Sequence, residues 1–397
     1  MLQSEEAARR LGVKLPTLYA YVSRGLLASH PAADGRRSLF LAEDVEALAR
    51  RARGGRRTET RLATVTTATT QLREDGPLYR GRPATALARS SPYEDVAELL
   101  WQGADDPGAR PWASLPLDAP HTLSAADRLR WAVLMAGAAD PLRADLRPGA
   151  VRVAARRLVA TLVRAVPATV GPAHGGGAVP ALELDGLRVA GSLAGVLATR
   201  LAPAPDGAAV GAVNAALVLL ADHELAASTL AVRVAASTRA DLYDAVLAGL
   251  AVMGGALHGG ASQLAHGLLG EARRLGPGPA LNESLRWQGL VPGFGHSVYR
   301  GPDPRFSVLR AVVGDLGDAA WSDTLEAVVE LAADQGLPPP NVDLGLAALA
   351  LATGMPADAG RTVFTVARVA GWTAHYLEEL EERPLRYRAR AVYAGGT

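Results

Sequence analysis

Residues 254–305 hold three histidines, and two of them, His258 and His296, stand in surroundings suited to chemistry. His258 follows Gly-Gly-Ala-Leu and precedes two further glycines, and His296 closes the run Gly-Phe-Gly-His. Glycines in these places let the backbone bend and present an imidazole to a ligand instead of burying it in a helix. Arg300 and Arg305 follow His296 within ten residues, and their guanidinium groups suit phosphate and carboxylate. The stretch therefore predicts a polar site.

Metal binding and serine hydrolysis are two other chemistries that histidines can serve. The chain has no cysteine, and no His-x-x-x-His pair or carboxylate at ligand spacing accompanies these histidines, which argues against a zinc site. No G-x-S-x-G motif is present, which argues against a hydrolase with a Ser-His-Asp triad. His266 lies in the helix-like run ASQLAHGLL, and we predict a structural role for it. We expect no metal ion at this site.

Two other segments carry single candidate residues. In Leu-Ala-Asp-His-Glu, His223 lies between two acids; taken alone, such a histidine is more often structural than functional. In Pro-Pro-Pro-Asn-Val-Asp, the prolines stop any helix before Asn341, and Asp343 falls at the start of a very apolar helix. Asp343 is then either an N-cap or a partly desolvated carboxylate of the kind that acts as a general base.

The C-terminal segment supplies further cations. Arg368 precedes Gly-Trp, and His375 and Glu378 follow on one face of the expected helix. Arg388 and Arg390 lie in the tail, where arginines are usually solvated. The segment taken alone therefore leaves the role of the tail arginines open.

Length and composition define the elements that must position these side chains. The 397 residues suggest two or three domains, and 49% hydrophobic residues indicate a folded protein. Residues 123–275 are Ala/Leu/Val-rich, with apolar residues at three- and four-residue spacing, which predicts a mainly α body of stacked helices. The N-terminus lacks the apolar core of a signal peptide, and no long apolar run is free of charge. We therefore expect a cytoplasmic protein that does not enter a membrane.

The first 57 residues differ from the rest of the chain. An N-cap at Ser4, a glycine at residue 12 and a second helix opening at Leu15-Pro16 predict two short helices joined by a turn. A basic hairpin tip, a short strand and a third helix from about Ala42 follow. This pattern resembles the winged helix-turn-helix of the MerR and excisionase type.

The resemblance implies DNA binding, with the second helix in the major groove and the wing against phosphate. Residues 1–57 carry a net charge of +5, with eleven Lys+Arg against six Asp+Glu, whereas the whole chain carries +1. The implied DNA contacts are Tyr19, Arg24, Arg36 and Arg37. The alternative is a docking or dimerisation module whose arginines are solvated.

The remainder, residues 58–397, resembles citrate synthases. The motifs in chain order are a hairpin around Asp75-Gly76, ADHE…ST…R…AST, GGALHGGA, PGFGHSVYRGPDPR, PNVD and RVAGWTAH. The resemblance implies the mainly helical citrate synthase fold, with a large domain and a small mobile domain at about residues 260–355. It also implies a homodimer with composite active sites.

The resemblance assigns the reaction to three residues. Asp343 would remove a methyl proton from the acetyl thioester, His258 would stabilise the enol, and His296 would protonate the carbonyl oxygen of oxaloacetate. The ligand contacts that it implies are His223, Arg305, Arg368 and Arg388 for the carboxylates of oxaloacetate, and Gly293, Phe294, Gly295 and Arg300 for coenzyme A. The counterpart of Arg388 reaches in from the second subunit.

The implied function is the Claisen condensation of acetyl-CoA with oxaloacetate, the step that forms citrate in the tricarboxylic acid cycle. It would need no metal and no redox cofactor, because the CoA thioester is itself a substrate. A 2-methylcitrate synthase that uses propionyl-CoA is the nearest alternative. The alternative of another class is a DNA-binding regulator whose synthase-like body senses CoA esters or oxoacids.

Overall fold

The computed structural model divides the chain into two compact units, one within the N-terminal residues up to Val65 and the other at Thr66–Arg388. The residues that it describes are 1–11, 13, 15–23, 27–31, 38–42, 44, 45, 48, 65–102, 111–169, 179–184, 187–255, 259–288 and 291–388. Each unit has its own hydrophobic core.

The N-terminal unit contains two short helices and a small antiparallel sheet. Its elements are β1 (Leu2–Gln3), α1 (Ser4–Leu11), α2 (Leu15–Ser23), β2 (His30–Pro31) and β3 (Ser38–Phe40), with strand order β1-β3-β2. Leu18 of α2 and Phe40 of β3 are fully buried in its core with Ala7 of α1. The expected helix-turn-helix with a strand-bearing wing is therefore confirmed in outline.

The Thr66–Arg388 unit, called the body below, opens with a three-stranded antiparallel sheet. Strands β4 (Thr70–Arg73), β5 (Gly76–Tyr79) and β6 (Arg82–Pro83) pair in sequence order, and Thr70 lies opposite Tyr79. The hairpin expected around Asp75-Gly76 is present as the β4–β5 turn. Tyr79 is fully buried, so this sheet is attached to the helical core.

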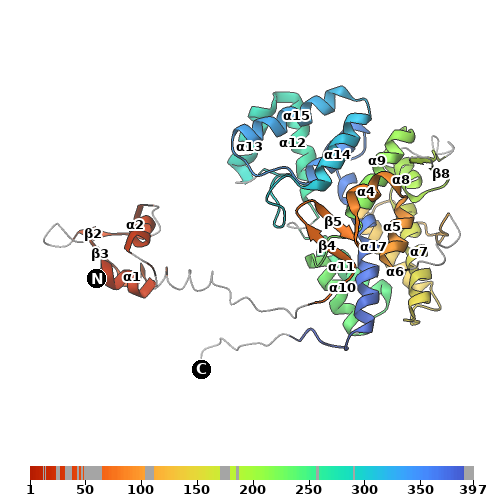
Figure 1. Cartoon of the computed structure of the whole chain (residues 1–397), viewed down its shortest axis with the longest axis horizontal. Helices are drawn as coiled ribbons and strands as arrows, with labels where there is room; N and C mark the ends of the chain where they lie inside the picture. Colours follow the sequence, from red (N-terminus) through yellow and green to blue (C-terminus); the bar gives the residue numbers. More distant parts are fainter. Residues whose placement is uncertain are drawn as a thin grey trace. The chain divides into compact units, whose positions relative to one another are not determined.

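The rest of the body, as far as the structure describes it, is mainly helical, as the apolar spacing predicts. The first group of elements is α4 (Ala84–Ser90), α5 (Tyr93–Leu100), α6 (Ala125–Ala138), α7 (Pro148–Ala165), the hairpin β7 (Leu182–Leu184) and β8 (Leu187–Val189), α8 (Leu193–Leu201), α9 (Gly207–Leu220), α10 (Ala227–Ser237) and α11 (Leu242–Met253). The long helix α17 (Ala359–Glu381) contacts α5, α7, α9, α10 and α11, and Figure 1 shows it within this group. Helix α17 is buried along most of its length because helices surround it.

Five helices form a second group, which Figure 1 shows at the top of the body. They are α12 (Ala261–Leu275), α13 (Pro277–Gln288), α14 (Pro304–Asp315), α15 (Ala319–Asp334) and α16 (Val342–Ala352), and they pack mainly on one another. Helices α14 and α16 also contact α9 and α17 of the first group. The small domain predicted at about residues 260–355 covers these helices, and its mobility stays a prediction.

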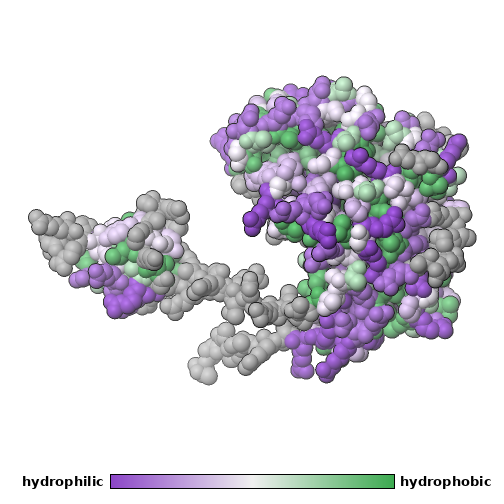
Figure 2. Space-filling view, viewed as in Figure 1, coloured by the Kyte–Doolittle hydropathy of each residue, from purple (hydrophilic) through white to green (hydrophobic). Residues whose placement is uncertain are grey.

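The described surface is mixed in character. Figure 2 shows hydrophilic and hydrophobic side chains interspersed over the face of the body that it presents. Within the described ranges, no helix combines the length and the apolar character that crossing a membrane requires.

Candidate active site

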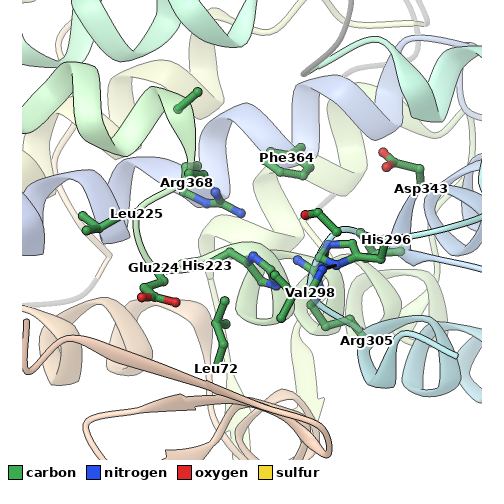
Figure 3. A pocket seen from close by; sticks show the side chains of 14 residues that line it. Leu72, His223, Glu224, Leu225, His296, Val298, Arg305, Asp343, Phe364 and Arg368 are labelled. Carbon is green, nitrogen blue, oxygen red and sulfur yellow. Dashed lines mark hydrogen bonds between the residues drawn. The ribbon is translucent and has the colours of Figure 1, made fainter. Parts of the chain in front are cut away.

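One cavity of about 480 Å³ collects five of the predicted site residues, and Figure 3 shows it from close by. Its size lies in the range of small-molecule sites. The five are His223 from the α9–α10 loop, His296 from the loop before α14, Arg305 from α14, Asp343 from α16 and Arg368 from α17. The cavity thus lies where the two groups of helices meet.

The loop that carries His296 is held by a glycine turn. Gly293 and Gly295 have φ angles of +85° and +80°, and a Cβ on Gly293 would lie 2.8 Å from the Cβ of Leu344. The backbone N–H of Gly295 donates to the carbonyl of Pro339 at 2.7 Å, and that of Asn341 donates to the carbonyl of Gly293 at 2.8 Å. The turn is therefore fastened to the segment that leads into α16, which places His296 beside that helix.

Asp343 is the second residue of α16 and is not its N-cap. Asn341 is the N-cap, and its side-chain oxygen accepts a hydrogen bond from the Asp343 backbone N–H at 3.0 Å. No hydrogen bond or ion pair to the Asp343 carboxylate is found among the described residues, and the side chain lines the cavity. Burial raises the pKa of Asp343 to about 6, with Arg305 opposing the rise and Asp303 adding to it. A carboxylate of this kind suits a general base near neutral pH.

Arg305 is held by a buried ion pair. Its guanidinium donates to both carboxylate oxygens of Asp303, at 3.0 Å from Nε and 2.8 Å from Nη2. Asp303 also accepts hydrogen bonds from the backbone N–H groups of Arg305, at 3.0 Å, and Val342, at 3.2 Å. Burial acts to lower the pKa of Arg305, but Asp303 outweighs it and the pKa is raised. Asp303, for which the sequence motifs predict no role, thereby joins the first turns of α14 and α16.

The hydrogen bonds of His296 determine which ring nitrogen carries the proton. Its Nδ1 accepts from the backbone N–H groups of Val298 at 3.0 Å and Tyr299 at 3.3 Å. Burial, with Arg305 nearby, lowers the pKa of His296, so the ring is neutral at pH 7. We therefore assign the proton to Nε2, which lies 3.4 Å from Nη2 of Arg305. Because both of these nitrogens are then donors, a ligand oxygen between them would satisfy both.

His223 is likewise kept neutral. Burial is the main cause that lowers the pKa of His223 well below its ordinary value, and Arg305, Arg368 and His296 add to it. Its Nε2 lies 3.1 Å from the hydroxyl of Tyr299. The Tyr299 ring also lies 4.7 Å from that of His296, so this one side chain supports both histidines. The sequence gives Tyr299 no role of its own, and the one signal for it is its place in the His-Ser-Val-Tyr-Arg run.

Arg368 has hydrogen-bonding capacity to spare. It is 1% exposed, its Nε donates to the carbonyl of Leu220 at 2.9 Å, and its Nη2 has no hydrogen-bond partner among the described residues. Its guanidinium lies over the ring of Phe364 at 4.6 Å. Burial lowers the pKa of Arg368 to about 10, so it remains a cation at neutral pH. A buried cation with a free N–H beside a cavity favours an anionic ligand.

Other predicted residues of the body lie elsewhere. His258 falls outside the described residues. Arg300 and Arg388 are exposed and do not line the cavity. Gly293, Phe294 and Gly295 form the turn described above, and their contact with coenzyme A stays a prediction.

Of the four predicted DNA contacts, Tyr19 is the one that the structure describes. Tyr19 is exposed on α2, and its hydroxyl lies 3.1 Å from that of Ser4. Arg24, Arg36 and Arg37 fall outside the described residues. For metals, no group of three His, Asp or Glu side chains in the described part of the chain is placed to hold an ion.

Comparison with protein families matches residues 56–390 to "Citrate synthase, C-terminal domain" and residues 1–53 to "Helix-turn-helix domain". A 2-methylcitrate synthase of Mycobacterium tuberculosis is 30% identical over 339 residues, covering 80% of this chain and 84% of that protein. Citrate synthase 2 of Bacillus subtilis is 34% identical over 196 residues, and a citrate synthase of Haloferax volcanii is 38% identical over 186 residues. These two matches cover 48% and 45% of this chain and about half of each relative, 52% and 49%.

Solved structures agree with the fold. Citrate synthase of Thermotoga maritima has a TM-score of 0.64 at 24% identity, with 84% of this chain and 93% of that chain covered. The Thermoplasma acidophilum citrate synthase, in a ternary complex with carboxymethyl coenzyme A and oxaloacetate, has a TM-score of 0.62 at 22% identity, with 85% and 95% covered.

Changing Asp343 to Asn tests the desolvation of this carboxylate independently of any activity. Since its pKa is raised from 3.8 to about 6, the folded state holds the proton more tightly than the unfolded state. The free energy of unfolding of the wild type therefore falls between about pH 4 and pH 6 and stays reduced above that range. We expect the Asp343→Asn variant to be more stable than the wild type by about 2–3 kcal/mol at pH 7.5 and to lose most of this advantage at pH 4.

Urea unfolding across this pH range measures the difference. The matched control is Asp323→Asn, which neutralises an exposed carboxylate on α15 and should show no such trend. A stability difference between Asp343→Asn and wild type that does not change with pH would contradict the assignment.

Proposed function

The chain belongs to the citrate synthase family, and from that premise we propose that it condenses acetyl-CoA with oxaloacetate to give citrate and free CoA. One observation carries the proposal. A carboxylate with a pKa of about 6, Asp343, shares one cavity with two buried guanidinium groups, those of Arg305 and Arg368. A dianionic oxoacid and a carbon acid need that combination of charges.

Oxaloacetate would bind through its two carboxylates. Arg368 offers an Nη2 that lacks a partner, and Arg305 presents the edge of a guanidinium that Asp303 already orients. His223 is neutral and adds a hydrogen bond without adding charge. Bidentate guanidinium–carboxylate pairs in this cavity would both orient the oxoacid and compensate its charge.

In the proposed reaction, Asp343 accepts a proton and His296 donates one. Asp343 takes a proton from the thioester methyl group while His258 stabilises the enol oxygen. The methyl carbon then bonds to the keto carbon of oxaloacetate, and Nε2–H of His296 gives its proton to the keto oxygen. Water hydrolyses the resulting citryl thioester and releases CoA. An acid and a base must act together because neither is strong enough to enolise a thioester alone.

The acyl group would contact apolar side chains of the cavity lining, which include Leu72, Val298, Val342 and Phe364. We propose acetyl as the preferred group and propionyl, giving 2-methylcitrate, as the alternative, since relatives carry both names. The Gly293–Gly295 turn and the exposed Arg300 would bind the nucleotide part of coenzyme A. The reaction as written requires neither a metal nor a redox cofactor.

A thiol-release assay with acetyl-CoA and oxaloacetate tests the activity directly. We expect turnover by the wild type and a loss of at least about a thousandfold in kcat for Asp343→Asn, because the proton acceptor is removed. Asp323→Asn serves as the control and should keep full activity. A higher kcat/KM with propionyl-CoA would favour the alternative substrate, and no turnover with either thioester would refute the enzyme proposal.

We also propose a homodimer in which Arg388 completes the partner's site. Arg388 is exposed, and its side chain does not line the cavity of its own subunit. Large apolar side chains are exposed on α6 (Leu134 and Met135), on α7 (Val153) and on the segment between these helices (Leu142). Exposed apolar side chains gathered on neighbouring elements favour a subunit interface.

Complementation between two inactive variants tests this arrangement. Asp343→Asn and Arg388→Ala are co-expressed with different tags, and the mixed dimers are compared with each parent. If Arg388 acts in trans, one of the two sites in a mixed dimer is intact, so purified mixed dimers should have about half of wild-type activity and the unfractionated random mixture about a quarter. Arg383→Ala, an exposed arginine in the same tail, should remain active alone. Activity no higher than that of the parents would contradict the composite site.

A second function is favoured by the helix-turn-helix match at residues 1–53. We propose that the N-terminal unit binds DNA through α2 and the wing, so that the body could report CoA esters or oxoacids to a promoter. The exposed position of Tyr19 on α2 supports this proposal, as does the net charge of +5 over residues 1–57.

A gel shift with the genomic DNA upstream of the coding sequence measures this binding. We expect affinity to fall steeply with rising salt and to be reduced about tenfold or more in the Arg36→Ala, Arg37→Ala double variant, because each arginine would neutralise a phosphate. The Arg9→Ala, Arg10→Ala variant makes the same charge change on α1, where both arginines pair with Glu6, and should bind nearly as well as wild type. Absent or salt-insensitive binding would refute the DNA proposal.

A further inference from the structure

The turn that presents His223 to the cavity depends on a buried carboxylate. Asp222 is fully buried, and its Oδ2 accepts a hydrogen bond from the backbone N–H of Glu224 at 3.1 Å. Glu224 has a φ angle of +55°, in the left-handed region that residues other than glycine seldom adopt. The Asp222 carboxylate thus stabilises a strained turn around His223, in the manner of an Asx-turn.

Helix α17 contacts this turn through three residues on one of its faces, at positions 368, 371 and 375. Arg368 donates to the carbonyl of Leu220, and the backbone N–H of Gly371 donates to the carbonyl of Ala221 at 2.9 Å. A Cβ on Gly371 would lie 2.2 Å from Oδ1 of Asp222, so only glycine allows this approach. His375 follows one turn later, with Nε2 at 3.3 Å from Oδ2 of Asp222.

The other side of the His375 ring determines its tautomer. Nδ1 of His375 lies 2.9 Å from Nη1 of Arg233, within hydrogen-bond distance, whereas Oε2 of Glu378 is farther from it, at 3.7 Å. Arginine has donors only, so Nδ1 must accept, and the proton of the ring lies on Nε2, directed at Asp222. The side chains of Arg233 and His375 are both fully buried, so bulk water does not compete for this contact.

Arg233 is fixed in turn by two glutamates of α17. Its Nη1 donates to Glu378 and its Nε to Glu379, each at 2.9 Å. Glu379 also accepts two hydrogen bonds from Arg386, the residue two before Arg388. The Arg233 guanidinium, which contacts Nδ1 of His375, is therefore fixed in place by hydrogen bonds to both glutamates.

We infer that His375 is a positioning residue, which donates from Nε2 to Asp222 and thereby holds the turn that presents His223 to the oxoacid. Its effect on substrate rests on the proposed function, because it assumes that His223 contacts oxaloacetate. Its side chain does not line the cavity, so its effect on a bound oxoacid would act through the turn and not by direct contact.

Glutamine and leucine at position 375 separate positioning from packing. A glutamine can accept from Arg233 through Oε1 and donate to Asp222 through Nε2, whereas a leucine of similar volume can do neither. We expect His375→Leu to raise the KM for oxaloacetate about tenfold or more, with a much smaller change in the KM for acetyl-CoA. We expect His375→Gln to remain within about threefold of wild type in both.

Thr373→Val is the matched control. Thr373 is fully buried on the same helix, and among the described residues its hydroxyl bonds only the carbonyl of Val369. This variant loses one buried hydrogen bond and should leave both KM values unchanged. An unchanged KM for oxaloacetate in His375→Leu, or a His375→Gln variant as impaired as His375→Leu, would overturn the inference.

A measurement that requires no activity completes the test. In ¹⁵N NMR of the wild-type protein labelled at histidine, with His375→Gln used to assign the signal, we expect His375 to show a protonated Nε2 and an unprotonated Nδ1. A proton on Nδ1 would overturn the inference even if the protein is an active synthase. The expected tautomer in a protein without turnover would instead refute the proposed function and leave the support of the turn by His375 standing.

Discussion

The buried pairing of Asp303 with Arg305 is the interaction on which the candidate site most depends. Asp303 caps α14, accepts from the first backbone N–H of α16 and binds the guanidinium of Arg305 with both oxygens. Both side chains are almost fully buried, so removing either would leave an uncompensated charge in the core. Since α16 carries Asp343, this one carboxylate sets the position of a cation relative to the proposed base.

Helix α17 contributes the opposite side of the cavity through a second buried polar network. Arg368, Gly371 and His375 contact the loop that ends α9, and that loop carries His223. The two networks belong to different groups of helices, and residues of both line the cavity. Any relative movement of the two groups would therefore change the separation of Arg305 from Arg368, which are the groups proposed to bind the two ends of one dianion.

Local sequence signals predicted where single residues lie in the elements better than they predicted the contacts between side chains. The prolines before Asn341 and the apolar run after it were enough to place Asp343 at the start of a helix, although they did not show that Asn341 is the N-cap. Tyr299 and Asp222 could not be assigned a role in this way. Their contacts, with His223 and His375, join residues far apart in the chain, and no period of a helix or strand encodes such pairs.

The buried charges of the cavity also link binding of the oxoacid to the base strength of Asp343 in the proposed reaction. Arg305 opposes the effect of burial on Asp343, and its attraction lowers the pKa of that carboxyl. An oxoacid bound to Arg305 would offset this attraction and bring further negative charge near Asp343, so the pKa of the carboxyl would rise. A carboxylate with a higher pKa is a stronger base. Binding of the first substrate would thus strengthen the group that must deprotonate the second, without any change in the residues that surround it.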